Sequence, residues 1–211
     1  MLTPLTLFNV DALTASGAAE DRRAIVLYLR EYLRTGKIVE PPKLKVAYKP
    51  IRLDRNREPV GQASWKWSEL TGKYLGCQFW SIEALRVASG FVNCLGGASL
   101  KRRLEEASRS KHDESIQHEH VFPRESWAAR MKPIVGRGEP PSESDLEALL
   151  DRLCIGCVVT RAEHSEVGRR PGVFDNPWLR YQGTTIRLVP NPNWTESHLA
   201  WITAAGLLEP R

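Results

Sequence analysis

The chain has 211 residues, which is enough for one sizeable domain or two small ones. Its hydrophobic content of 42% and charged content of 26% are ordinary for a globular protein. The sequence contains no run of about 18 apolar residues, so no membrane span is predicted. The net charge of +5 favours a polyanionic partner such as nucleic acid. The N-terminus lacks the basic segment and small-residue cleavage site of a secretory signal, so we expect a cytoplasmic protein without a membrane partner.

Local patterns predict a mixed, mainly helical N-terminal half. Apolar periodicity indicates helices, alternation of polarity indicates a strand, and glycine or proline marks the ends. The aromatic residues that are dense between residues 64 and 85 are expected mainly in the core. The predicted elements are a helix at 18–35 that ends at Gly36, a strand at 43–53, a loop at 54–62, a helix from the N-cap Ser81 to about Ala88, and a helix at 98–109.

In the second half, short β-branched stretches alternate with amphipathic segments, so strands and helices are expected to alternate. Ser142 or Ser144 is the predicted N-cap of one of these helices. The predicted elements are a strand that ends at Val121, helices at 125–131 and 144–153, a strand at 154–159, a helix after Thr160, a strand at 185–189, and a helix that ends at Gly206.

The chain has four cysteines, which in a chain of this size do not make a disulfide framework. Cys154 and Cys157 have the spacing of half a zinc knuckle, which Cys77 and Cys94 would complete. The pair lies in a predicted strand, however, where residues three apart face opposite sides. Buried free thiols and a structural zinc site therefore both stay open as interpretations.

The most informative segment is a polar cluster at the end of a predicted strand. His118, Glu119 and His120 are followed by a short apolar stretch and by Pro123, which has no N–H to continue a strand ladder. On a strand His118 and His120 face one side and Glu119 faces the other. Imidazole and carboxylate groups gathered in this way favour metal binding or acid–base chemistry.

A second segment complements this cluster from farther along the chain. The apolar strand at 154–159 runs directly into a helix, because Thr160 is an N-cap and Glu163 stands at the capping-box spacing. His164 then lies in the first turns of that helix. The predicted order is strand, strand and helix, with one histidine–carboxylate cluster on the first strand and one histidine on the helix. The strand at 154–159 is expected to pair antiparallel with residues 115–121, which would bring His164 over the first strand.

This arrangement resembles the HNH, or ββα-metal, nuclease family. Residues 119–123 match the first half of the family pattern, in which an acidic residue and a histidine precede a short apolar stretch and a proline. His164 matches the last histidine of the pattern. The resemblance covers about residues 114–170, and the middle Asn of the family has no clear counterpart.

The resemblance implies an α+β fold class. The expected architecture is a ββα-metal nuclease core within residues 98–211, with a helical insertion at 125–150. Residues 1–97 are expected to form an N-terminal helical or mixed region. Its role is open, and a second copy of the chain or a protein partner could bind through it.

The resemblance also implies roles for the site residues. His120 corresponds to the general base, and Glu119 and His164 correspond to the metal ligands. Two protein ligands leave most coordination positions to water and phosphate, which suits Mg²⁺ or Mn²⁺ better than Zn²⁺. His118 is an alternative ligand, because strand geometry places it on the same face as His120.

The expected function is hydrolysis of phosphodiester bonds in DNA by a metal-dependent endonuclease, in restriction, phage defence or a mobile element. Arginine and lysine residues flank the predicted site on both sides, as an anionic substrate requires. The candidate nucleic-acid contacts are Arg124, Arg161, Lys101, Arg102 and Arg103.

Two other functions are compatible with the same residues. A nucleic-acid-binding module with a ββα-like fold would need no turnover, and the missing Asn supports it. A zinc-dependent hydrolase of a small substrate would use His118, His120 and His164.

Overall fold

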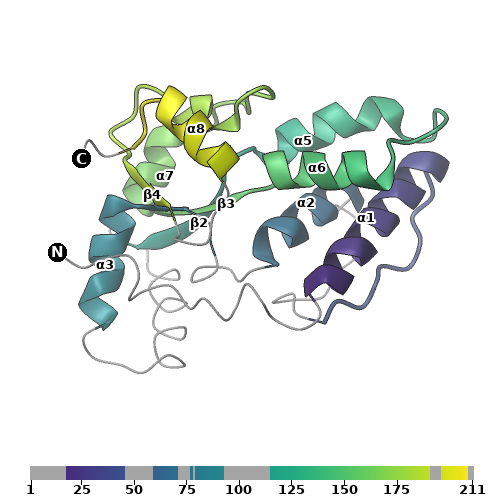
Figure 1. The fold of residues 1–211 in the computed structure, drawn as a ribbon, viewed down its shortest axis with the longest axis horizontal. Coiled ribbons are helices and arrows are strands. Elements are labelled where there is room, and N and C mark those ends of the chain that lie inside the picture. Colours follow the sequence, from purple (N-terminus) through teal and green to yellow (C-terminus); the bar gives the residue numbers. More distant parts are fainter. Residues whose placement is uncertain are drawn as a thin grey trace.

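The computed structural model describes residues 18–45, 59–70, 77, 79–92, 115–190 and 196–208. Over these ranges the fold is a mixture of α and β structure, which confirms the predicted class at that level. A helical part and a sheet part lie side by side (Figure 1). In the described ranges no helix is both long and apolar enough to span a bilayer.

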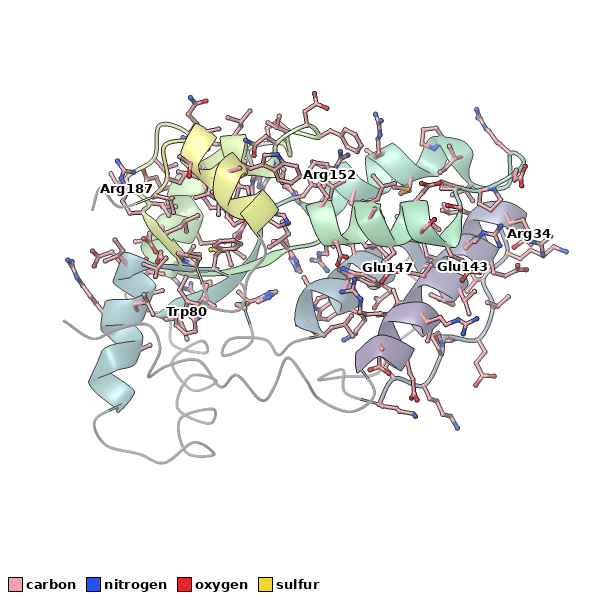
Figure 2. All side chains as sticks on the ribbon, viewed as in Figure 1. Arg34, Trp80, Glu143, Glu147, Arg152 and Arg187 are labelled. Carbon is pink, nitrogen blue, oxygen red and sulfur yellow. The ribbon has the colours of Figure 1, made fainter. Side chains whose placement is uncertain are left out.

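The helical part joins segments from both halves of the sequence. Helix α1 packs against α2 and α6, and α2 also packs against α5. Arg22 of α1 pairs with Glu147 and Asp151 of α6 at 3.1 and 2.6 Å, where the two helices lie side by side (Figure 2). The elements of this part are α1 (Ala18–Thr35), α2 (Pro59–Glu69), α5 (Arg124–Met131), the 3-10 turn η3 (Lys132–Ile134) and α6 (Glu143–Leu153).

One buried cluster holds these helices together. Burial of apolar side chains contributes roughly 25 cal/mol per Å² removed from water, so this shared face is the main stabilising contact between the helices. Trp127 of α5 also donates from Nε1 to the Val60 carbonyl of α2 at 2.9 Å. The cluster includes Ile25, Leu29, Leu33, Val60, Ala63, Trp67, Trp127, Leu146 and Leu150.

The sheet part contains four described strands in the order β2-β3-β1-β4. Strand β3 is antiparallel to β2 and parallel to β1, and β1 is antiparallel to β4. Helices α7 and α8 lie above this sheet and α3 lies below it (Figure 1). The elements of this part are β1 (Phe79–Ser81), α3 (Ile82–Val92), β2 (Ile116–His120), β3 (Gly156–Thr160), α7 (Arg161–Val167), the 3-10 turn η4 (Pro177–Tyr181), β4 (Leu188–Pro190) and α8 (Glu196–Ala204).

The antiparallel pairing of the two strands that flank the insertion is confirmed. Ile116 lies opposite Thr160, and His120 lies opposite Gly156. The predicted capping box is also confirmed, with Thr160 and Glu163 bonded reciprocally at the start of α7. Strand β3 therefore passes into α7 without an intervening loop.

Most helix predictions in the described ranges are confirmed within one or two residues. Helix α1 ends before Gly36, whose φ of +67° is readily adopted by glycine. Ser142, not Ser144, is the N-cap of α6, and it accepts from the Asp145 N–H. Ser81 caps α3 as predicted, but that helix continues past Ala88 to Val92.

Two predictions are wrong in part. The loop predicted at 54–62 is helical from Pro59, because Pro suits the first turn of a helix and Val60 packs into the core. The strand predicted at 185–189 begins only at Leu188. The Thr185 backbone N–H donates to the Glu166 carboxylate at 2.7 Å and therefore does not join a strand ladder.

Several predictions fall wholly or partly outside the described residues. Of the strand predicted at 43–53, residues 43–45 are not in a strand and the rest lies outside the described residues. The helix predicted at 98–109 and the boundary predicted near residue 97 also lie outside them. Strand β1, which belongs to the predicted N-terminal region, lies between β3 and β4 in the sheet.

Gly172 allows the segment after α7 to pack closely on the end of β2. A Cβ atom there would lie 2.4 Å from ring atoms of the buried Phe122 and 3.0 Å from Pro123 Cδ. We therefore expect Gly172→Ala to lower the free energy of unfolding by about 1–3 kcal/mol, as overpacking of a core does. Urea denaturation followed by circular dichroism measures this change.

Gly61 provides the matched control, because a Cβ atom there meets nothing within 4 Å and the residue lies in α2. Gly61→Ala should leave stability unchanged or raise it by up to about 1 kcal/mol. Equal effects of the two substitutions would contradict the packing argument.

Candidate functional site

The polar cluster lies on β2, at the edge of the described sheet. Alternation along the strand sends His118 and His120 to one face and Glu119 to the other. The two imidazole rings stand edge to face with centroids 5.2 Å apart. His118 lies against β3, where a Cβ atom on Gly156 would come within 2.5 Å of its Nε2.

On the other face, Glu119 meets the histidine that the sequence predicts as its partner. Glu119 is 4% exposed, and its Oε2 contacts Nδ1 of His164, which lies 45 residues along the chain. The capping box of Thr160 and Glu163 begins α7 at the end of β3, and Ser81 of β1 donates to Glu163 at 2.5 Å. These bonds fix the first turns of α7 so that His164 lies over β2.

Arg180 is the second partner of Glu119, and the sequence analysis did not identify it. The Arg180 side chain is buried and donates to Glu119 Oε1. It also donates to the backbone carbonyls of His120, Gly168 and Arg170 at 2.9, 3.0 and 3.0 Å. One guanidinium therefore connects the end of β2, the end of α7 and η4.

A weak local signal precedes Arg180. Asn176 caps η4 by accepting from the Trp178 N–H, and Pro177 follows at the first helical position. This pattern marks the start of a short helix. It gives no indication that the fourth residue of that helix meets a carboxylate on a distant strand.

The surroundings of Glu119 and His164 shift both groups toward their charged forms. Burial by itself raises the pKa of Glu119, but the hydrogen bonds and charges of His164 and Arg180 outweigh it and leave that pKa lowered. The hydrogen bond to Glu119 raises the pKa of His164, against the opposing effect of partial burial. The pair therefore favours a carboxylate facing an imidazolium.

Side chains from both faces of β2 line one cleft of about 1030 Å³. It lies where the helical part meets the sheet part, and the four predicted site residues His118, Glu119, His120 and His164 all line it. Its walls include Trp65, Glu69, His118, Glu119, His120, Pro123, Arg124, His164, Gly168, Arg169, Arg170 and Arg180.

The predicted nucleic-acid contacts are distributed unevenly around this cleft. Arg124, at the start of α5, is exposed and lines it, together with the exposed Arg169 and Arg170 that the sequence analysis did not assign to phosphate contacts. Arg161 donates to the Ser115 hydroxyl at 3.4 Å and is not among the residues that line the cleft. Lys101, Arg102 and Arg103 lie outside the described residues.

Few protein side chains of the site could act as ligands of a metal ion. Glu119 and His164 supply one carboxylate and one imidazole at contact distance. Among the residues that the structure describes, no group of three or more His, Cys, Asp or Glu side chains could hold a metal ion. The described residues therefore offer at most these two donors, and both oxygens of Glu119 already contact His164 or Arg180.

The described cysteines do not fit the zinc-knuckle interpretation. Cys154 and Cys157 are buried free thiols, Cys77 is also buried, and Cys94 lies outside the described residues. Burial raises the pKa of Cys154 to about 12, and it also raises the pKa of Cys157. Zinc binds the thiolate, so these surroundings disfavour ligation.

No family model matches this sequence, and neither the curated proteins nor the solved structures contain a match to it.

Arg180→Met should lower the free energy of unfolding by about 3–5 kcal/mol, because the buried Glu119 carboxylate then loses its cationic partner. Adding Glu119→Gln should recover part of this loss, because it removes the uncompensated charge. Denaturant unfolding of the two single variants and the double variant measures the coupling.

Arg187 is the matched control, because the bonds found for its guanidinium are to the carbonyls of Thr184 and Ile186 and not to a carboxylate. Arg187→Met should lower stability by about 1 kcal/mol or less. Additive effects of the Arg180 and Glu119 substitutions would contradict the coupling.

Proposed function

We propose that this protein is a metal-dependent endonuclease that hydrolyses phosphodiester bonds in DNA, of the kind used in restriction, phage defence or mobile elements. The observation that carries the proposal is the contact between Glu119 and His164 beside an arginine-lined cleft. The antiparallel strands β2 and β3, followed directly by α7, support the proposal, because the ββα-metal core has the same strand–strand–helix order.

The charges of the cleft support an anionic substrate. Arg124, Arg169 and Arg170 line it and are exposed to solvent. Guanidinium groups bind phosphate oxygens through paired N–H donors, and their charge attracts a polyanion before contact. In this proposal the three arginines hold the backbone phosphates on either side of the bond to be cut.

Glu119 and His164 would hold a single Mg²⁺ or Mn²⁺ ion, and His164 would lose its imidazolium proton on binding, because a metal ligand is the neutral imidazole. When bound, such an ion neutralises the charge that develops on the phosphoryl and leaving oxygens. Arg180 supports this role, because its bonds to Glu119 and to the His120 carbonyl hold the carboxylate in a fixed position. The lowered pKa of Glu119 keeps it ionised at neutral pH.

His120 is the proposed general base, which takes a proton from the attacking water. It lines the same cleft as Glu119 and His164, although it leaves β2 on the opposite face. It is the last residue of β2, and the chain bends at Val121. His118, on the same face, is the lower-ranked alternative for either role.

One observation favours a second candidate, a nucleic-acid-binding module without turnover. Arg180 and His164 already satisfy the two oxygens of Glu119 within the protein. The same residues then serve as an internal brace and require no cation. A zinc hydrolase built on His118, His120 and His164 is less well supported, because the described residues contain no such three-ligand group.

Nicking of supercoiled DNA in the presence of Mg²⁺ distinguishes the two candidates. His120→Ala should lower the rate by about 10²–10⁴-fold, because a general base contributes that much. His164→Ala should lower the rate as well, and raised Mn²⁺ should restore part of it, because only one ligand is lost. His120→Ala should not be restored by Mn²⁺.

Ser165→Ala is the control on the same helix, since the Ser165 hydroxyl donates to the Arg161 carbonyl at 2.9 Å and is exposed. Its nicking rate should equal that of the wild type. A wild-type protein that binds DNA but never nicks it, with any divalent metal, would support the binding module instead.

DNA affinity should fall steeply as salt rises, because arginine–phosphate contacts release counterions. Replacing both Arg124 and Arg169 with Gln should reduce the slope of log affinity against log salt by about 2, at roughly 0.9 per phosphate contact. Arg34→Gln serves as the control, because Arg34 pairs with Glu31 at the far end of α1 (Figure 2). Fluorescence anisotropy in EDTA measures the slopes, and a salt-independent affinity would contradict the phosphate contacts.

A further inference from the structure

Helix α2 brings a serine to the imidazole of the proposed base. The Ser68 hydroxyl lies 3.2 Å from Nδ1 of His120, which is 52 residues away in the chain. Ser68 is 1% exposed, so bulk water does not compete for this contact. No local sequence signal links the two residues.

The bonds of Ser68 decide which ring nitrogen carries the proton. The Ser68 hydroxyl donates its one hydrogen to the Trp65 carbonyl at 2.8 Å, and a carbonyl can only accept. Toward His120 the hydroxyl oxygen is then an acceptor, so Nδ1 must be the donor. In the neutral ring this leaves Nε2 as the unprotonated nitrogen.

Helix α2, which carries Ser68, is held in place by hydrogen bonds to two other helices. Trp67, its neighbour on α2, donates from Nε1 to Asp151 of α6 at 3.0 Å, and Trp127 of α5 bonds the first turn of α2. Because α2 is anchored to two other helices, the position of the Ser68 hydroxyl relative to the end of β2 is set by the helical core.

We propose that Ser68 is a positioning residue, which fixes the orientation and the tautomer of His120 so that Nε2 is the nitrogen that accepts a proton. Helix α2 thereby completes the candidate site, and this gives the N-terminal half of the chain a role in the chemistry. The catalytic part of this inference rests on the proposed nuclease function. The tautomer part does not.

The first measurement is the long-range ¹H–¹⁵N correlation spectrum of the histidine rings, which reports the tautomer without any assay of activity. The signals of His120 are assigned by comparison with His120→Ala. The wild-type protein should show the proton on Nδ1, and Ser68→Ala should show a mixture of tautomers or a shift to Nε2. A wild-type ring protonated on Nε2 would overturn the inference.

Ser64→Ala is the matched control. Ser64 lies one turn earlier on α2 and is also 1% exposed, but its hydroxyl contacts the Cys154 thiol. The His120 spectrum of this variant should match that of the wild type. A change of tautomer in Ser64→Ala equal to that in Ser68→Ala would mean that any cavity in α2 has this effect, and the inference would fail.

The second measurement is DNA nicking. Ser68→Ala should lower kcat by about 10–100-fold with little change in KM, because loss of a residue that orients a catalytic group has effects of that size or larger. Ser68→Thr, which keeps the hydroxyl, should restore much of the rate and the Nδ1–H tautomer, and Ser64→Ala should retain the wild-type kcat.

The two proposals fail in different ways. A wild-type protein with the Nδ1–H tautomer but no nicking would remove the nuclease function and leave the Ser68 contact intact. Ser68→Ala with wild-type kcat and an unchanged tautomer would overturn the positioning role, while the nuclease function would stand.

Discussion

The buried carboxylate of Glu119 sets the constraint on which the site depends. An ionised carboxylate is stable away from water only if charged or polar partners surround it. Here the partners come from two other segments, His164 on α7 and Arg180 on η4. The strand edge, the helix start and the η4 turn therefore depend on one another, because Glu119, His164 and Arg180 each contact an ionic partner on another segment.

The same constraint shapes the cleft. Arg180 binds the carbonyls of His120 and Gly168 in addition to Glu119, so the end of β2 and the end of α7 are held at one distance. Gly172 then lets the following segment pass over Phe122 and Pro123. The result is a hollow beside the polar strand with exposed arginines along its wall, where the proposed phosphodiester substrate would bind.

The alternation of β2 divides the chemistry between two faces. Glu119 faces α7, while His118 and His120 face the region where α2 supplies Ser68. The sheet part therefore supplies the partners of the carboxylate, and the helical part supplies the Ser68 contact that we propose orients His120. A site of this kind needs both parts, since each of them holds only one side of the strand.

The sequence by itself determined the elements whose signals are local. The capping box at Thr160, the β-branched strand before it and the apolar stripe of α1 depend on neighbouring residues. The structure has the capping box and α1 where they were predicted, and the strand begins two residues later than predicted, at Gly156, because Cys154 caps the end of α6. The strand pairing that brings Glu119 to His164 followed from the same local signals. Only the tertiary structure showed the contact of Arg180 with Glu119, the contact of Ser68 with His120 and the start of α2 at Pro59. Their partners lie 52 to 61 residues away or in a core built from distant helices, and such contacts leave no periodicity or spacing in the chain.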